Sequence, residues 1–180
     1  MTRAREISIP STPTALVLLN NTDFSAVASA SIDDVFSATY DNYLLVMSFT
    51  SSANAAIRFR YRASSADNST SNYSYHIQFS TTSSTAYAAV TGNAQTSNFL
   101  TSSEGVSSLK AVSMTVFRPF LTDYSAMLGM QNLSSASGAA PYSGGIMHSA
   151  FTATTSFTGF SVFPDSGTIT GSVKVYGYKE

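Results

Sequence analysis

Apolar and polar side chains alternate with a period of two along most of the chain from residue 15 onward, and this pattern restricts the fold more than any other feature. Successive side chains of a β-strand point to opposite faces, so the alternation predicts strands that bury one face. Such runs occupy 55–63, 73–80, 111–116, 124–130 and 169–178. We expect the apolar parity of each run to face a core. At 124–130 this parity consists of Tyr124, Ala126, Leu128 and Met130.

The segment 43–49 is apolar on both parities, as expected for a central strand between two packed layers. Clusters of turn-forming residues separate the alternating runs, and short strands at such spacing favour an antiparallel β-sandwich or barrel. These clusters lie at 51–54, 66–72, 91–93, 102–105, 134–145 and 164–167. The best helical candidate, 31–36, supports one or two turns at most.

Residues 1–14 follow no period and differ from the rest of the chain. They contain Arg3, Arg5, Pro10 and Pro13, and proline resists both helices and central strands. We interpret this segment as an extended N-terminal arm, with a frayed terminus as the alternative. The predicted organisation is an arm over 1–14 and one β-sandwich domain over 15–180, since 180 residues fit a single domain.

The surface is rich in hydroxyl groups and poor in charge. The chain has 33 Ser and 21 Thr, only 11% charged residues and a net charge of −1, whereas about 25% charged residues is usual. This composition favours neither nucleic acid nor an anionic membrane as a partner. Cysteine is absent, which excludes disulfides and thiolate metal sites, and we expect no signal peptide or membrane span.

Low charge combined with many aromatic and methionine residues suggests self-association. The chain has 10 Tyr, 12 Phe and 6 Met, and these residue types are enriched at protein interfaces. A large aromatic core is the alternative explanation. We therefore expect a homo-oligomer.

No constellation of residues indicates catalysis. We interpret the only two histidines, His76 and His148, as surface or interface residues, because neither can be tied to a nucleophile and an acid. The Asp-Ser-Gly string starting at Asp165 occurs once and suits a hairpin turn better than a peptidase site. Asp33 and Asp34 are adjacent and lack an oxygen-rich calcium loop around them. We expect no catalytic residue, no cofactor and no metal site.

Three arginines share one parity of one predicted strand and form the most specific charged feature. For Arg58, Arg60 and Arg62, the simplest interpretation is a solvent-facing row that keeps a sheet face soluble. Two alternatives are contact with acids of a neighbouring subunit or shell protein, and contact with phosphate or sugar.

Several segments resemble virion structural proteins of tailed bacteriophages. One is Tyr-Asp-Asn-Tyr followed by an apolar strand, within 37–49, and the alternating strand 56–62 comes after it. A second is the segment 157–178, which resembles a closing hairpin, and a third is the opening 2–8. The resemblance covers about a third of the chain. It implies a jelly-roll-like virion component, usually trimeric, and carries over no catalytic residue.

The chain has no coiled-coil heptads or β-helical repeat for a fibre shaft, which favours a compact virion part. We expect a trimeric capsid cement or decoration protein, assembled in the host cytoplasm, that binds the major capsid protein or other virion proteins. Arg3, Arg5 and Pro10 of the arm would contact the shell. The alternative is a receptor- or glycan-binding module of the tail that uses Tyr87 and Tyr142. A small glycan hydrolase is disfavoured by the scarcity of acids and histidines.

Overall fold

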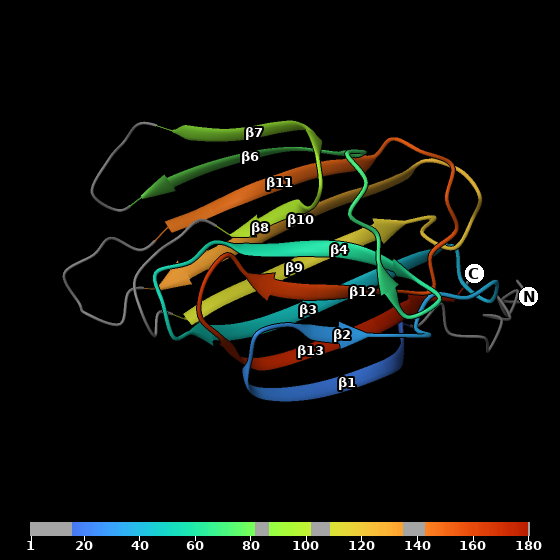
Figure 1. Cartoon of the computed structure of the whole chain (residues 1–180), viewed down its shortest axis with the longest axis horizontal. Coiled ribbons are helices and arrows are strands. Elements are labelled where there is room, and N and C mark those ends of the chain that lie inside the picture. The colour runs from blue at the N-terminus through green and yellow to red at the C-terminus, as the bar shows by residue number, and fades with distance from the viewer. Residues whose placement is uncertain (1–15, 82–86, 102–108, 135–142, 180) are drawn as a thin grey trace, which may run out of the picture.

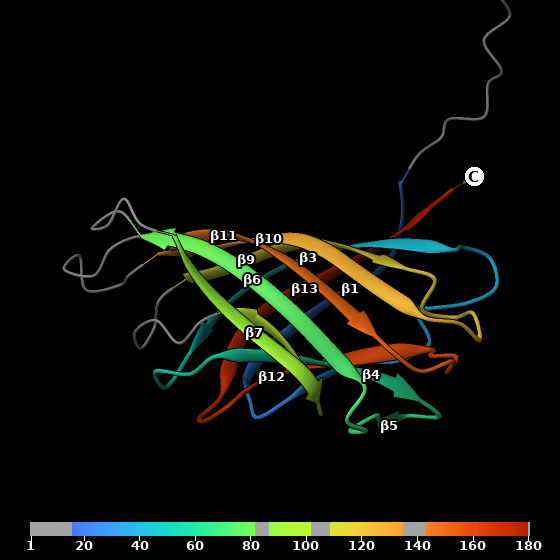
Figure 2. The same cartoon turned by 90° about the horizontal axis from the view of Figure 1, so that it is seen from above.

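The fold consists of two antiparallel β-sheets packed face to face. The computed structural model describes residues 16–81, 87–101, 109–134 and 143–179, and within them every regular element is a strand. Figures 1 and 2 show the two layers in perpendicular views. The predicted antiparallel β-sandwich is confirmed. The possible helical turns at 31–36 are not present, because Ser31 pairs with Ser161 in a short strand instead.

The larger sheet has eight strands and the smaller has five. In spatial order, the larger sheet contains β1 (Leu16–Val27), β13 (Ile169–Tyr178), β3 (Asn42–Ser51), β9 (Leu109–Phe117), β10 (Ser125–Ser134), β11 (Ser143–Phe151), β6 (Tyr73–Thr81) and β7 (Ala88–Gln95). The smaller sheet contains β2 (Ala30–Ile32), β12 (Gly159–Pro164), β4 (Ile57–Ala63) and β5 (Ala66–Asp67), with β8 (Asn98–Thr101) also paired to β4.

Eight of the strands pair in a nested order. β1 pairs with β13, β2 with β12, β3 with β9, and β4 with β8. A long antiparallel hairpin rolled across two sheets would produce this order. The remaining long strands, β6 with β7 and β10 with β11, form two hairpins that widen the larger sheet beyond β9.

The core between the sheets is dominated by aromatic rings. Tyr61 stacks on Phe157 with ring centroids 4.5 Å apart, and Phe59 stacks on Phe160 at 5.2 Å. Ile57, Phe59 and Tyr61 are fully buried, as the alternation predicts. The apolar parities of β9 and β13 also face this core as predicted, namely Val112, Met114 and Val116, and Ile169, Val173 and Val175.

Strand β10 is turned the other way from the prediction. Its apolar parity faces outward: Leu128 is 52% exposed and Met130 is 62% exposed. Residues opposed across an antiparallel pair share a face, and Gly129 lies opposite the buried Met114. A Cβ at Gly129 would lie only 2.6 Å from the Ser113 carbonyl oxygen. Glycine therefore fits this inward position, and the apolar side chains of β10 are left outside.

Two predicted turns also differ from the structure. Residues 164–167 do not form a hairpin, because β12 belongs to the smaller sheet and β13 to the larger, so this segment links the two layers. Gly167 adopts a φ of 75°, which glycine tolerates without strain. Residues 91–93 lie within β7 instead of forming a turn.

Candidate functional site

The outer face of the larger sheet, which points away from the smaller sheet, is the most unusual surface of the molecule. The strand registers place its side chains in rows that cross the sheet. One row contains Leu18, Tyr176, Leu44, Thr115, Leu128, His148 and His76. The next contains Asn21, Lys174, Val46, Ser113, Met130, Ile146 and Gln78.

The centre of this face is apolar and solvent-exposed. Next to Leu128 and Met130, Ile146 is 44% exposed and Val46 is 39% exposed. Sheet faces exposed to water are usually polar, and contiguous apolar patches beyond a few hundred Å² mark interaction sites. We call the outward residues of β3, β9, β10 and β11 the outer apolar face.

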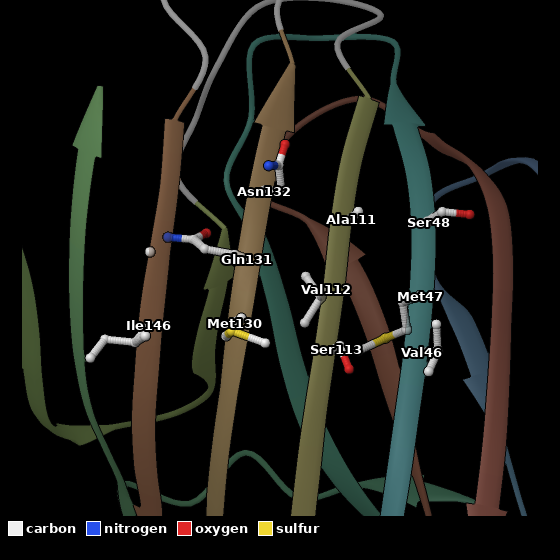
Figure 3. A pocket seen from close by; sticks show the side chains of 11 residues that line it. Val46, Met47, Ser48, Ala111, Val112, Ser113, Met130, Gln131, Asn132 and Ile146 are labelled. Carbon is white, nitrogen blue, oxygen red and sulfur yellow. The ribbon is translucent and has the colours of Figure 1, made fainter. Parts of the chain in front are cut away.

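The outer apolar face is grooved along β9. The outward side chains of this strand are small at Ala111, Ser113 and Thr115, whereas Val46 on one side and Met130 on the other are larger (Figure 3). Two adjoining hollows of about 580 and 350 Å³ follow this line. A ridge of apolar side chains on β10 therefore runs beside a groove on β9.

Formal charge is absent from the middle of this face. From β3 to β6, no described outward position carries Lys, Arg, Asp or Glu. The nearest charged side chain in these two rows is Lys174 of β13, and Asp23 of β1 lies opposite Ser172 in the next row. A partner would therefore desolvate hydroxyl and apolar groups here at a small electrostatic cost.

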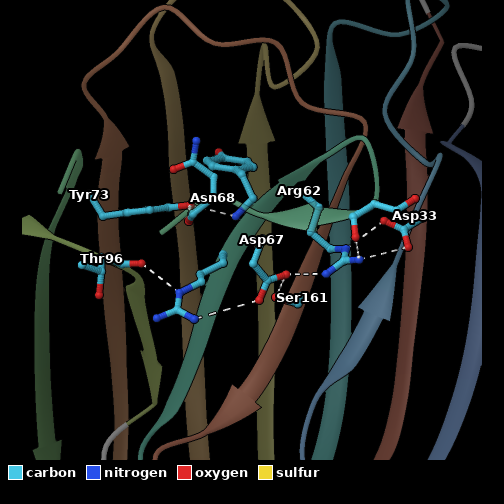
Figure 4. A network of polar contacts seen from close by, with 10 residues as sticks. Asp33, Arg62, Asp67, Asn68, Tyr73, Thr96 and Ser161 are labelled. Carbon is cyan, nitrogen blue, oxygen red and sulfur yellow. Dashed lines mark hydrogen bonds and ion pairs between the residues drawn. The ribbon is translucent and has the colours of Figure 1, made fainter. Parts of the chain in front are cut away.

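The smaller sheet has the opposite character, because its outer face carries the arginine row of β4. Figure 4 shows one member of this row, Arg62, with Asp33 and Asp67 beside it. Arg58 donates to both carboxylate oxygens of Asp165, at 2.8 and 3.1 Å. Arg62 lies between Asp33, at 2.8 Å, and Asp67. Hydrogen bonding to Asp33 raises the pKa of Arg62 above its ordinary value, against an opposing effect of desolvation.

The third arginine, Arg60, donates to the carbonyl oxygen of Thr96 at 2.9 Å and lies 4.0 Å from Asp67. Its guanidinium also stacks over the ring of Phe163 at 4.7 Å. The three arginines share one face of β4, as predicted, and their ion-pair partners belong to the same chain. Their contact with a second subunit or a shell stays a prediction.

The other predicted positions are scattered or lie outside the described residues. Arg3, Arg5, Pro10 and Tyr142 fall outside them. Tyr87 is 82% exposed. Within the described part of the chain there is no group of three or more His, Cys, Asp or Glu that could hold a metal ion. The same part contains no helix long and apolar enough to cross a membrane.

Sequence reasoning missed the outer apolar face, although one signal pointed to it. The double-sided apolar character of 43–49 requires a cover on both faces of β3. The smaller sheet covers Tyr43, Leu45 and Met47, whereas Val46 on the other side stays exposed. No protein-family model, curated protein or solved structure matches the chain.

Proposed function

We propose that this protein is a non-enzymatic structural component of a bacteriophage particle, a capsid cement or decoration protein that acts as a homotrimer. The outer apolar face is the observation that carries the assembly part of this proposal. The virion part is supported by the resemblance of 37–49, 56–62 and 157–178 to phage structural proteins. The nested pairing of eight strands supports the comparison with jelly-roll components.

The whole outer face of the larger sheet, which has the outer apolar face at its centre, is large enough for a stable interface. Strands lie about 4.8 Å apart and residues on one face repeat every ~6.8 Å, so each outward residue covers roughly 33 Å². Four outward residues on each of the six strands from β13 to β6 cover about 800 Å². Stable interfaces bury about 800 Å² per partner. The available area is therefore sufficient without the arm.

A second copy of the chain fits this face because the ridge and the groove lie side by side. The ridge of Leu128 and Met130 on one copy would enter the groove over Ser113 on another. Packing sheets approach to about 10 Å, which leaves room for interdigitated side chains of this size. Copies joined in this way would cover Val46 and Ile146, whose exposure in an isolated chain is otherwise unfavourable.

Replacing both ridge residues with Glu tests the assembly. The double variant Leu128→Glu/Met130→Glu should fold like the wild type, because both positions are exposed, and should sediment as a monomer. Tyr87→Glu is the matched control, since it adds charge at an exposed aromatic residue outside the six strands. A wild type that sediments as a monomer at every concentration would contradict the proposal, as would a double variant that assembles normally.

The attachment to the shell is tested separately. A variant lacking residues 1–14, which include Arg3, Arg5 and Pro10, should still assemble but should no longer bind capsids in a co-sedimentation assay. Band densities from purified virions give the copy number, which is high for a cement protein and low for a tail component. Normal capsid binding by the truncated variant would refute the role of the arm.

A glycan-binding module of the tail is the second candidate function. The exposure of Tyr87 favours it, because carbohydrate sites use exposed aromatic rings. A glycan array probed with the wild type and with Tyr87→Ala distinguishes the two functions. A wild-type signal that the substitution removes would favour the tail module.

A further inference from the structure

The two histidines of the chain are direct neighbours across two strands. His76 of β6 lies opposite His148 of β11, and their rings are stacked with centroids 5.8 Å apart and planes inclined by 12°. The sequence contains only these two His and no Cys. All the imidazole nitrogen that the chain offers is therefore concentrated at one point.

This juxtaposition is improbable by chance. A residue in a strand has at most two directly opposed neighbours, and the chain offers 179 other positions. A second histidine placed at random would be such a neighbour about once in 90 cases. The two strands are also far apart in the sequence, so local composition does not explain the pairing.

Both imidazoles are available to a ligand. No hydrogen bond within the described part of the chain engages either ring, so their nitrogen lone pairs are not committed there. Both residues line an open hollow of about 400 Å³, and its described lining contains no Lys or Arg. In the wall of this hollow, Asn93 accepts a hydrogen bond from Ser74 at 2.8 Å.

The ring separation is close to that of a metal chelate. Zinc binds imidazole nitrogen at about 2.0–2.1 Å in tetrahedral geometry, which places the centroids of two rings on one ion about 5 Å apart. The observed 5.8 Å is close to this value, and the two nearly parallel rings must turn toward each other for one nitrogen of each to reach the same ion. Imidazole suits zinc, copper and nickel, whereas calcium and magnesium require oxygen ligands.

We propose that His76 and His148 together bind one divalent transition-metal ion of the zinc class. The two imidazoles supply two ligands, and the remaining coordination positions point outward from the sheet. The inference goes beyond the structural role proposed above and does not depend on it.

Isothermal titration calorimetry of the untagged full chain with Zn²⁺ tests the site. The wild type should bind Zn²⁺ saturably and should not bind Ca²⁺. His76→Gln and His148→Gln should each weaken zinc binding by about 100-fold, because each removes one arm of a chelate. Gln78→Ala, on the same face of β6, should leave zinc binding unchanged.

Three controls keep the result interpretable. Circular dichroism establishes that each variant is folded. Zinc binding should disappear in acidic buffer, because protonated imidazole is not a ligand. The Met130→Glu variant keeps both histidines and also Leu128, the direct neighbour of His148, so it separates loss of assembly from loss of metal. No zinc binding by the folded wild type would overturn the site, and so would binding that survives both histidine substitutions.

Discussion

Substituting Gly129 with Ala tests the orientation of β10, from which the outer apolar face arises. In the structure Gly129 points inward, where an added Cβ would lie 2.6 Å from the Ser113 carbonyl oxygen and 2.8 Å from the Cα of Met114. Both neighbours are backbone atoms of β9, so relief requires the two strands to separate. If β10 were turned as its apolar parity suggests, the same methyl group would project into solvent without a clash.

The expected cost follows from overpacking. One extra methyl group in a packed site destabilises by about 1–3 kcal/mol. For a chain of this size, each kcal/mol lowers the melting temperature by roughly 2–4 °C. A loss of about 2 kcal/mol therefore predicts a decrease of about 4–8 °C.

Gly144→Ala is the matched control for this experiment. Its added Cβ would meet only the Gln131 carbonyl oxygen, at 3.8 Å. Removal of a flexible glycine from a strand should then leave stability unchanged or raise it by about 0.5–1 kcal/mol. Differential scanning calorimetry of the two variants and the wild type gives the comparison. Equal melting temperatures for Gly129→Ala and Gly144→Ala would refute the inward position of Gly129.

Three further predictions concern the core and the arginine row. Tyr73→Phe should cost about 1–3 kcal/mol, because the phenol oxygen accepts from the buried backbone N–H of Tyr61. Tyr61→Phe should be neutral or stabilising, because the described residues give that buried hydroxyl no hydrogen bond of good geometry. Urea unfolding compares the two variants. Arg62→Met should cost about 1.5–3 kcal/mol of stability, because it breaks contacts with two carboxylates. Arg118→Met, which breaks a half-exposed ion pair with Asp123, should cost less than about 1 kcal/mol. Equal losses of stability for the two variants in thermal unfolding would contradict this prediction. Burial raises the pKa of Tyr43, Tyr61 and Tyr73 above 10.0, so folding favours the neutral phenols and stability should be lost as the pH rises above about 10. Tyrosinate absorbance for these residues should therefore increase only as the protein unfolds. Full ionisation of the tyrosines before unfolding would contradict this prediction.

The inward and outward faces of most strands could be predicted from the sequence because one parity is plainly apolar. In β4 the alternation of Ile57, Phe59 and Tyr61 with arginines allows only one assignment of the inward and outward faces. In β10 both parities contain apolar residues, and the parity with Leu128 and Met130 is the more apolar one. Its outward orientation is imposed by pairing with β9, where Val112, Met114 and Val116 already fill the inner layer. The alternation within β10 itself does not show which of its faces the pairing with β9 turns inward.

The remaining differences arise from long-range pairing. His76 and His148 are brought together because the β6–β7 and β10–β11 hairpins add to the same sheet, and no local motif signals that association. The segment starting at Asp165 has turn chemistry that serves a hairpin and a crossing between sheets equally well. Only the destination of β13, next to β1 and β3, distinguishes the two.

Oxidation of Met130 by dilute hydrogen peroxide, read by mass spectrometry, most directly tests whether copies of the chain cover the outer apolar face. Met130 is 62% exposed in the single chain, whereas Met47 and Met114 in the core are 1% exposed. In the assembled protein Met130 should be protected to the level of these core residues, and in the Leu128→Glu variant it should oxidise readily. Rapid oxidation of Met130 in the assembled wild type would show that this face is uncovered and would contradict the proposal.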